Sequence, residues 1–415
     1  MVRVMSLRIG RRAALRAALS ILAAAALASG SFAAAAAAAA SDPAPARVYD
    51  PWLWQATVGQ RPAGPASVVF FTSNTRYFES TGVLVGRDGA YRLIPLQVGE
   101  DHGLLSPDGR HYVRPHRGVL VDLTTGAEDR THRPGIRALA WSPDGRTLLG
   151  TRDNDDAVIT YGPDNQQLND PAKPDDLLVV DPYDGAERVL AAGTFASHTT
   201  GAWSPDGSLV VVAGPTDPAV ERQRLTVTDA ARGGVRWQRD LDERHLLAGR
   251  GAWSPDGARI ALLAFDGCAG PACTLEEAAA RSWRLEFLDA ATGQPLGTSV
   301  PVDGWATELV GWRNGEAVLN RLSRETTFED RHASLVAVAA GGREQVLVTG
   351  PPGVSGFDVP ADLLADAVFA GSAPRPSPWA APWWLYPVVA LPALLLAVLL
   401  ARALLRRRER RASPG

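Results

Sequence analysis

The chain has 415 residues, of which 46% are hydrophobic, and its formal net charge at pH 7 is −3. A hydrophobic fraction of this size can build a packed core, which excludes a largely disordered chain. The charge is unevenly distributed, because the first 16 residues hold five arginines and the last 14 hold six, which leaves 31 basic and 44 acidic residues between them. This acidic balance argues against a nucleic-acid partner, which would require a basic face.

Residues 1–40 have the organisation of an export signal. Five arginines without any acidic residue precede an uncharged, alanine-rich run over residues 17–41, as in the charged and hydrophobic regions of a signal peptide. Ala38 and Ala40 supply a cleavage site before Ser41, and the alanine run leaves its position open by several residues. The pair at residues 11–12 loosely resembles a twin-arginine signal, so the twin-arginine and the general secretory routes both remain open.

An internal repeat organises the middle of the chain. The string Ser-Pro-Asp-Gly occurs four times, and Ala-Trp precedes it in the last three copies. Serine and aspartate can bond to the local backbone, proline fixes φ, and glycine takes the left-handed conformation, so each copy predicts a tight turn. A hydrophobic strand follows each turn, which predicts a hairpin. The turn residues are Ser106, Pro107, Asp108 and Gly109; Trp141, Ser142, Pro143, Asp144 and Gly145; Trp203, Ser204, Pro205, Asp206 and Gly207; and Trp253, Ser254, Pro255, Asp256 and Gly257.

A second pattern recurs between these turns. In it a short strand ends in aspartate and a glycine follows a few residues later, as in VLVDLTTG, LLVVDPYDG, LTVTDAARG and LEFLDAATG. Residues 311–315 (GWRNG) are a degenerate copy of the first turn, and residues 87–89 (RDG) are interpreted as a remnant of it. Two hairpins per repeat make a four-stranded unit, which is one blade of a β-propeller.

At this point the residues resemble a known family. Trp-Ser-Pro-Asp-Gly before a hydrophobic strand, then strand-Asp-x-x-Thr-Gly, looks like the WD40-like repeat of TolB-type propellers, which also occurs in the propellers of prolyl oligopeptidases. The resemblance covers roughly residues 91–350 and implies an all-β fold. It implies little about function, because propellers host many activities. TolB proteins also carry an α/β domain and prolyl oligopeptidases a serine-hydrolase domain, and we expect neither here.

The blade count follows from the repeats and the strands left over. Strand-like segments remain over residues 67–94 and 356–369, and a propeller often closes by completing one blade from both termini. We therefore predict six blades, with seven as the alternative. The five legible blades start near Asp101, Gly135, Thr199, Leu246 and Thr307.

Motifs for catalysis are absent from the sequence. It contains no Gly-x-Ser-x-Gly elbow, no Walker-type phosphate loop and no His-Glu-x-x-His. Acidic residues over 153–176 lack the alternation and glycine of a calcium loop, and His111 and His116 are not expected to share a metal. We predict no catalytic residue, no cofactor and no metal, and we expect the repeat tryptophans to pack between blades.

Cys268 and Cys273 are the only cysteines. Two cysteines alone in an exported domain usually pair, and a zinc site would need further ligands in the same loop. We therefore predict a disulfide that staples one loop.

A second hydrophobic segment lies near the C-terminus. Residues 376–401 contain no charged residue, and about 20 apolar residues in a helix cross the roughly 30 Å hydrocarbon layer. Trp379, Trp383, Trp384 and Tyr386 lie at its N-terminal end as an interfacial belt. The six arginines that follow it mark the cytoplasmic side.

These predictions combine into one organisation: signal peptide 1–40, N-terminal linker 41–65, propeller 66–370, proline-rich linker 371–381, transmembrane helix 382–405 and basic cytoplasmic tail 406–415. The expected location is the plasma membrane, crossed once, with the propeller outside. The expected function is binding or scaffolding of a protein, peptide or cell-envelope partner. The alternative is an enzyme, a hydrolase or lyase, with its active site in the propeller channel.

Overall fold

The computed structural model describes residues 44–72, 81–95, 103–114, 119–129, 136–152, 160–161, 167–168, 175–193, 199–217, 220–270, 272–325 and 330–412. The chain divides into two units, Met1–Asp42 and Pro43–Gly415, and only the second contains described residues. The predicted signal peptide, most of the acidic stretch over residues 153–176 and His116 lie outside the described residues.

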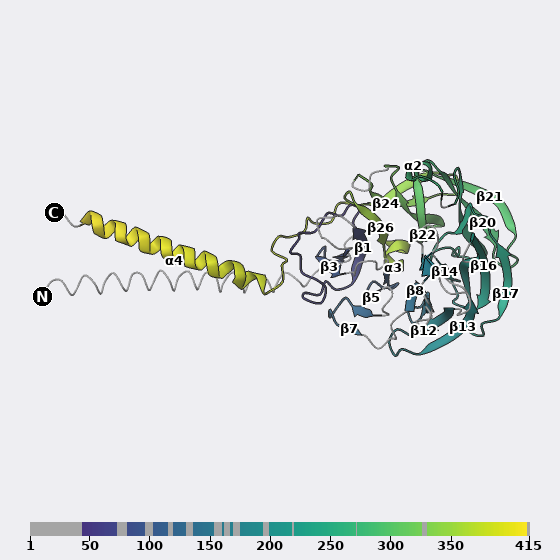
Figure 1. Ribbon diagram of the computed structural model, residues 1–415, viewed down its shortest axis with the longest axis horizontal. Helices are drawn as coiled ribbons and strands as arrows, with labels where there is room; N and C mark the ends of the chain where they lie inside the picture. The colour runs from purple at the N-terminus through teal and green to yellow at the C-terminus, as the bar shows by residue number, and fades with distance from the viewer. Residues whose placement is uncertain are drawn as a thin grey trace. The chain divides into compact units, whose positions relative to one another are not determined.

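Six four-stranded antiparallel sheets surround a central axis as the blades of a propeller (Figure 1). This arrangement confirms the predicted all-β fold and the choice of six blades. From the innermost strand outward, blade 1 is β26 (Val354–Asp358), β1 (Ala66–Thr72), β2 (Thr81–Gly86) and β3 (Tyr91–Pro95); blade 2 is β4 (Leu104–Leu105), β5 (His111–Val113), β6 (Leu120–Asp122) and β7 (Glu128–Asp129); blade 3 is β8 (Ile136–Trp141), β9 (Leu148–Arg152), β12 (Asp175–Val180) and β13 (Glu187–Gly193); blade 4 is β14 (Thr200–Trp203), β15 (Leu209–Asp217), β16 (Val220–Asp229) and β17 (Val235–Asp240); blade 5 is β18 (His245–Leu247), β19 (Arg259–Asp266), β20 (Ser282–Asp289) and β21 (Pro295–Val302); blade 6 is β22 (Trp305–Arg313), β23 (Glu316–Leu322), β24 (Ala333–Val338) and β25 (Glu344–Thr349). A small hairpin of β10 (Thr160–Tyr161) and β11 (Gln167–Leu168) lies between β9 and β12 in the sequence.

The core lies between neighbouring blades. All seven residues of β1 are buried and so are all six of β24, because the preceding blade covers one face of each sheet and the following blade covers the other. Such strands are expected to be continuous hydrophobic runs rather than alternating ones, as in VVFF and LVAV. The two middle strands of a blade, such as β1 and β24, therefore carry the core.

Blade 1 closes the ring with strands from both ends of the propeller. Three of its strands come from the N-terminal side, and β26 adds the fourth from the C-terminal side. The β1–β26 ladder pairs Val69 with Asp358 and Phe70 with Phe357, with a bulge near Thr72. Pairing with β26 therefore covers the edge of β1 that would otherwise be open, and blade 1 has four strands like the others.

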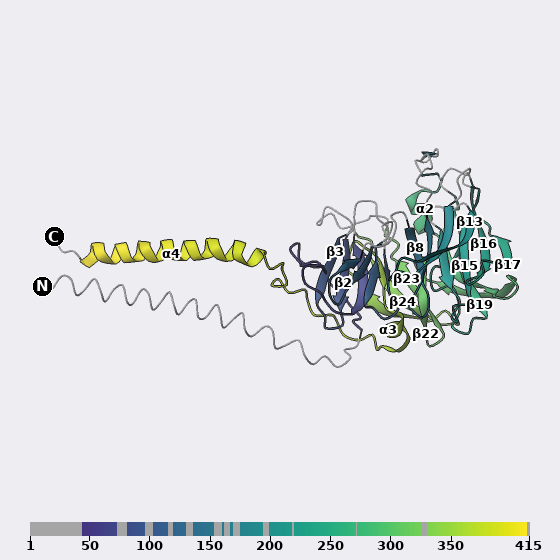
Figure 2. The same ribbon diagram turned by 90° about the horizontal axis from the view of Figure 1, so that it is seen from below.

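Three helices accompany the described strands: α2 (Leu275–Ala279), α3 (Ala361–Asp366) and α4 (Leu385–Ala412). Figure 2 shows α2 and α3 at opposite ends of the propeller. Residues 356–369 were expected to be strand-like, but only the part up to Asp358 is a strand. Helix α3 begins after Pro360, which suits the start of a helix, and it buries Leu364 against blade 6.

Residues 44–65 pack along the outer edges of blades 6 and 1. Arg47 forms a parallel bridge with Thr349 of β25, and Thr57 forms one with Leu93 of β3. The N–H of Ala56 donates to the carbonyl of Ala380 at 2.9 Å. This N-terminal segment therefore touches both the propeller and the stretch that precedes α4.

Helix α4 is the only helix of the described part that is long and apolar enough to cross a membrane. Its apolar stretch is Leu385–Leu405, and none of it is buried. Leu391 and Leu395 are more than 60% exposed, which a core helix of a soluble domain would not tolerate. Pro392 lies inside the helix.

Candidate functional site

The Ser-Pro-Asp-Gly strings join the first strand to the second in blades 2 to 5. In blade 4 the Oγ of Ser204 donates to Oδ1 of Asp206 at 2.6 Å, and the N–H of Leu209 donates to that Oγ at 2.9 Å. The glycine at the fourth position has a positive φ in each copy, for example 70° at Gly207. The hydrogen bond from Ser204 lowers the pKa of Asp206 below its usual value. The carboxylate therefore serves the turn itself. Equivalent serine–aspartate bonds are Ser106–Asp108, Ser142–Asp144 and Ser254–Asp256.

The second pattern closes the hairpin between the third and fourth strands. In blade 4 the Oδ1 of Asp229 accepts from the N–H groups of Ala231 and Arg232, each at 3.0 Å, and Gly233 has φ 71°. Residues 87–89, interpreted as a remnant of the first turn, lie instead between the third and fourth strands of blade 1. That assignment was wrong, because a turn with a left-handed glycine is required at both hairpins and Asp-Gly alone does not distinguish them.

The repeat tryptophans join consecutive blades. In each case the indole Nε1 donates to a backbone carbonyl of the preceding blade. The pairs are Trp141 with Leu104 at 3.4 Å, Trp203 with Ala140 at 3.3 Å, and Trp312 with Gly251 at 2.8 Å. Each acceptor belongs to the first strand, or its extension, of the preceding blade. Trp253 is buried at the same repeat position, and its Nε1 has no hydrogen-bond partner among the described residues. These side chains are therefore packing elements between blades.

The channel holds a cavity of about 480 Å³, formed mainly where the innermost strands begin. The Ser-Pro-Asp-Gly turns lie at the other end of those strands, and the blade 2 turn contacts α3 there, since the N–H of Asp362 donates to the carbonyl of Pro107. The structure thus separates the sequence-predicted turn residues from the channel cavity. Polar groups in the cavity wall are Arg137, Thr199, Thr200, Arg250, Thr307, Glu308, Asn320 and Ser355.

An ion-pair network crosses the channel. One guanidinium nitrogen of Arg250 lies 2.8 Å from Oδ1 of Asp358, and the other lies 3.4 Å from Oε1 of Glu308. The second oxygen of Asp358 accepts from the N–H of Leu105 at 2.7 Å. The network joins blades 1, 2, 5 and 6 through residues that belong to no sequence motif. Sequence reasoning missed it for that reason.

Asp358 is 3% exposed, and its protonation couples to folding. Burial raises its pKa to about 6 although Arg250 opposes the shift, and the unfolded value is about 3.9. The folded chain therefore holds this proton more tightly, so its contribution to the free energy of unfolding is complete below pH 4 and disappears as the pH rises to about 6. The turn aspartates Asp144 and Asp206 have lowered pKa values and titrate below this window.

We predict that wild-type protein loses stability relative to Asp358→Asn as the pH rises from about 4 to about 6, because asparagine does not titrate. Thermal melts of both proteins across this range measure the difference. A constant difference between the two melting temperatures would show that Asp358 keeps an ordinary pKa.

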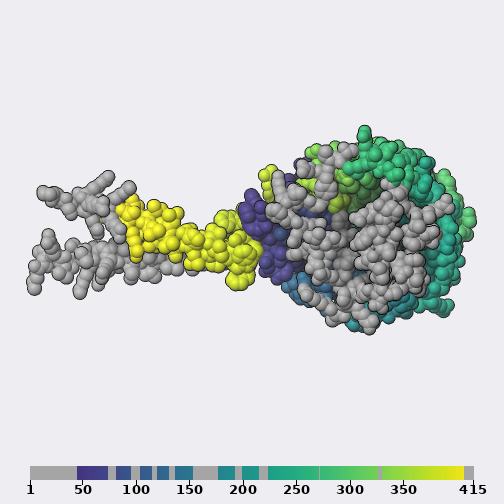
Figure 3. Space-filling model, viewed as in Figure 1, coloured from purple at the N-terminus to yellow at the C-terminus, as the bar shows by residue number. Residues whose placement is uncertain are grey.

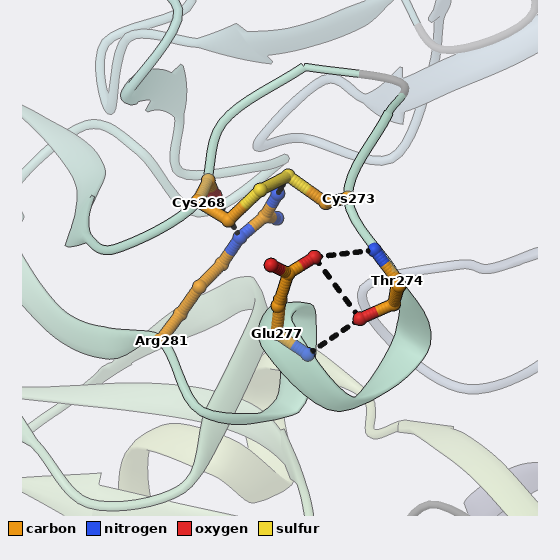
Figure 4. Close-up of a disulfide and its surroundings, with 5 residues drawn as sticks. All are labelled: Cys268, Cys273, Thr274, Glu277 and Arg281. Carbon is orange, nitrogen blue, oxygen red and sulfur yellow. Dashed lines mark hydrogen bonds between the residues drawn. A yellow bond between two sulfur atoms is a disulfide. The ribbon is translucent and has the colours of Figure 1, made fainter.

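The disulfide between Cys268 and Cys273 lies in the loop between the second and third strands of blade 5 (Figure 4). Helix α2 follows directly, and Thr274 and Glu277 form a capping box at its start. Nε of Arg281 donates to the carbonyl of Cys268 at 2.8 Å, and its guanidinium lies 4.2 Å above the ring of Phe265. The predicted pair therefore closes this loop on itself, and Arg281 holds the loop against Phe265 of β19.

We expect mass spectrometry under non-reducing conditions to find this linkage and no free thiol. Closure of so short a loop stabilises the folded state by about 2 kcal/mol in the chain-entropy model. The double variant Cys268→Ser, Cys273→Ser should lower the melting temperature accordingly, and a reducing agent should shift only the wild-type protein. Equal shifts in both proteins would contradict the assignment.

The remaining predicted polar residues do not gather into a metal site within the described part of the chain. His111 packs edge-on against Tyr183, with ring centroids 5.4 Å apart. Asp176 forms an ion pair with Arg152 at 2.9 Å. His111 therefore packs against a turn of the next blade, and Asp176 pairs with the adjacent strand of its own blade.

Comparisons with known proteins found similarity only among solved structures. No protein-family model and no curated protein matches the sequence. Among solved structures, TolB from Acinetobacter baumannii is 16% identical, with a TM-score of 0.43, over 71% of this chain and 66% of TolB. An oligogalacturonate lyase in complex with manganese is 16% identical, with a TM-score of 0.44, over 72% of this chain and 78% of the lyase. Pyrococcus horikoshii acylaminoacyl peptidase is 17% identical, with a TM-score of 0.38, over 71% of this chain and 47% of the peptidase. The protein is a six-bladed β-propeller, and propellers of this kind occur in both binding proteins and enzymes.

Proposed function

We propose that the protein is a membrane-anchored β-propeller on the outer side of the plasma membrane that binds a protein, peptide or cell-envelope partner. The observation that carries the anchoring is the fully exposed apolar stretch Leu385–Leu405 directly after the propeller. Arginines follow this stretch, and an arginine-rich signal-like segment precedes the propeller. Together they support an outside propeller and a cytoplasmic C-terminus.

The channel cavity supports the binding role. Its volume lies within the roughly 300–1,000 Å³ of ligand pockets, and its wall offers hydroxyl, amide and guanidinium groups. Arg250 is paired with both Asp358 and Glu308, so each of these three charged groups already has a partner within the protein. A preformed wall of polar and paired charged groups suits recognition of a polar segment of a partner.

One observation favours the enzyme alternative. A buried carboxyl with a raised pKa beside a channel is a feature of many active sites. However, both oxygens of Asp358 are engaged by Arg250 and Leu105, which supports a structural role for the group. If the protein is an enzyme, it should convert its partner into a product, and Glu308→Gln should abolish that conversion. If it is a binding protein, neither the wild type nor the variant should convert the partner.

Topology is tested with a reporter fused after Gly415 in intact cells. We expect the reporter to be cytoplasmic, the region around Lys173 to be cut by external protease, and the chain to stay in the membrane after carbonate extraction. Lys173 lies outside the described residues, and its accessibility is a prediction from the sequence. A chain that ends at Trp384 should be released from the membrane. Protection of Lys173 would contradict the orientation, and carbonate release of the full chain would contradict the anchor.

Binding is tested with a photo-crosslinking residue in the channel. Thr307 lines the cavity and is exposed, and Thr298 is also an exposed threonine, on the outer strand of blade 5. We expect a discrete adduct from position 307 and none from position 298 in intact cells. Equal labelling from both positions would count against the channel as the binding site.

A further inference from the structure

We infer that Trp52, Leu53 and Trp54 form a second membrane contact, which inserts into the lipid interface beside α4 and holds the outer edge of blade 1 against the bilayer. The inference rests on the proposed anchoring by α4. It adds a surface that the sequence placed in a linker, and it assigns the lipid headgroup region as the partner.

The three side chains form an exposed apolar patch. Trp52 is 42% exposed, Leu53 61% and Trp54 40%, and the two indole rings stack with centroids 5.0 Å apart. Soluble surfaces rarely leave two tryptophans and a leucine exposed in succession. Tryptophan is, however, the residue most typical of the membrane interface.

Hydrogen bonds attach this patch to the segment that enters the span. Nε1 of Trp52 donates to the carbonyl of Pro376 at 2.8 Å, and Nε1 of Trp54 donates to the carbonyl of Pro378 at 2.9 Å. The polar atom of each indole is thus satisfied within the protein, and its apolar ring remains exposed. Figure 3 shows the N-terminal segment in purple beside the yellow C-terminal segment. The patch is therefore continuous with the interfacial residues just before the span.

The neighbouring side chains extend the same surface. Trp379 is 73% exposed, and the hydroxyl of Tyr386 donates to its carbonyl. Arg375, which directly precedes Pro376, is exposed, and its guanidinium lies 5.6 Å above the ring of Tyr49. Exposed aromatic groups beside an arginine match the lipid interface, where cations meet phosphate groups. This charge pattern favours lipid over an apolar protein partner.

The place of the patch in the fold determines which part of the propeller faces the membrane. The segment that carries it pairs at Thr57 with β3, the outermost strand of blade 1. Insertion of the patch would therefore bring the rim of the propeller, and neither end of the channel, against the bilayer. Both channel mouths would remain accessible to a partner.

The test uses the full chain in nanodiscs that hold one copy each, made of phosphatidylcholine and phosphatidylglycerol. Single-cysteine variants carry an environment-sensitive fluorophore, and lipids with a nitroxide near the headgroup quench it. The two native cysteines are bonded to each other, so only the introduced thiol is labelled.

Three positions are labelled in turn. Leu53→Cys probes the patch. Val235→Cys is the matched control, since Val235 is 52% exposed on the outer strand of blade 4, across the ring from blade 1. Leu395→Cys reports on α4 with a nitroxide placed deeper in the lipid chain.

We expect quenching at position 53 to be about threefold greater than at position 235, as for an inserted interfacial group. Quenching at 395 with equal, weak quenching at 53 and 235 would overturn this inference and leave the anchor intact. Absence of quenching at 395 would overturn the anchor itself. A blue-shifted but unquenched fluorophore at 53 would show that protein covers the patch, which also contradicts the inference. Repeating the measurement with two copies per disc would then show whether the cover is a second copy of this chain.

Discussion

Asp358→Ala is expected to lower the free energy of unfolding by about 3–5 kcal/mol at pH 8, where the carboxylate is charged. The substitution leaves the guanidinium of Arg250, whose side chain is only 17% exposed, with Glu308 alone, and that carboxylate oxygen is 3.4 Å away. It also removes the acceptor of the Leu105 N–H, a bond that spans 253 residues of sequence. The lost interactions belong to β26, the strand that closes the ring. Their removal should therefore destabilise the whole propeller rather than one loop.

Thermal melts of the full chain in one detergent measure this effect. Asp362→Ala is the matched control, because Asp362 also forms an ion pair, with Arg87 at 2.6 Å, but its side chain is 45% exposed. An exposed pair contributes at most about 1 kcal/mol. Equal melting temperatures for the two variants would show that the channel network does not hold the ring together.

Gly109→Val is expected to destabilise the propeller more than Gly207→Val. Both glycines have φ near +70°, so a β-branched side chain costs about 1–3 kcal/mol in either turn. At Gly109 an added Cβ would also lie 2.8 Å from the carbonyl oxygen of Ala66 and from Cγ of Pro360, whereas at Gly207 the nearest atom is 4.0 Å away. The difference between the two variants therefore measures the close approach of blade 2 to blade 1.

Asp206→Asn serves as the control for these turns. Asparagine keeps the oxygen that accepts from Ser204 and Ser208, so its effect on the melting temperature should be small. If the turn were a ligand site, loss of this carboxylate would abolish binding and leave the melting temperature unchanged. A melt in which Asp206→Asn unfolds and Gly207→Val resembles the wild type would refute the turn assignment.

The blades were predictable because their turns are set by local chemistry. Serine, proline, aspartate and a left-handed glycine act within a few residues of one another, so each hairpin is visible without knowledge of the rest of the chain. Helix α3 also had a local signal, since Pro360 precedes the helix-forming run ADLLAD. A strand-like reading of that segment overlooked this signal.

The channel network had no local signal. Arg250, Glu308 and Asp358 come from three different blades, and only closure of the ring brings them together. The exposure of Trp52 and Trp54 is likewise a property of the folded surface, because a tryptophan pair in a sequence is as compatible with a core as with a rim. What the sequence could not predict therefore depends on contacts between distant parts of the chain.

The closure of blade 1 has a consequence for how the chain is made. The hydroxyl of Ser355 in β26 donates to the carbonyl of Phe71 in β1 across 284 residues of sequence, and joining ends so far apart costs about 5 kcal/mol of loop entropy. Because synthesis runs from the N-terminus, β1 must wait with an open edge until nearly the whole propeller has emerged. During this interval the edge is a template onto which any extended peptide can add as a strand. The nascent protein is therefore most vulnerable to aggregation, and most in need of a chaperone, just before its last inner strand appears.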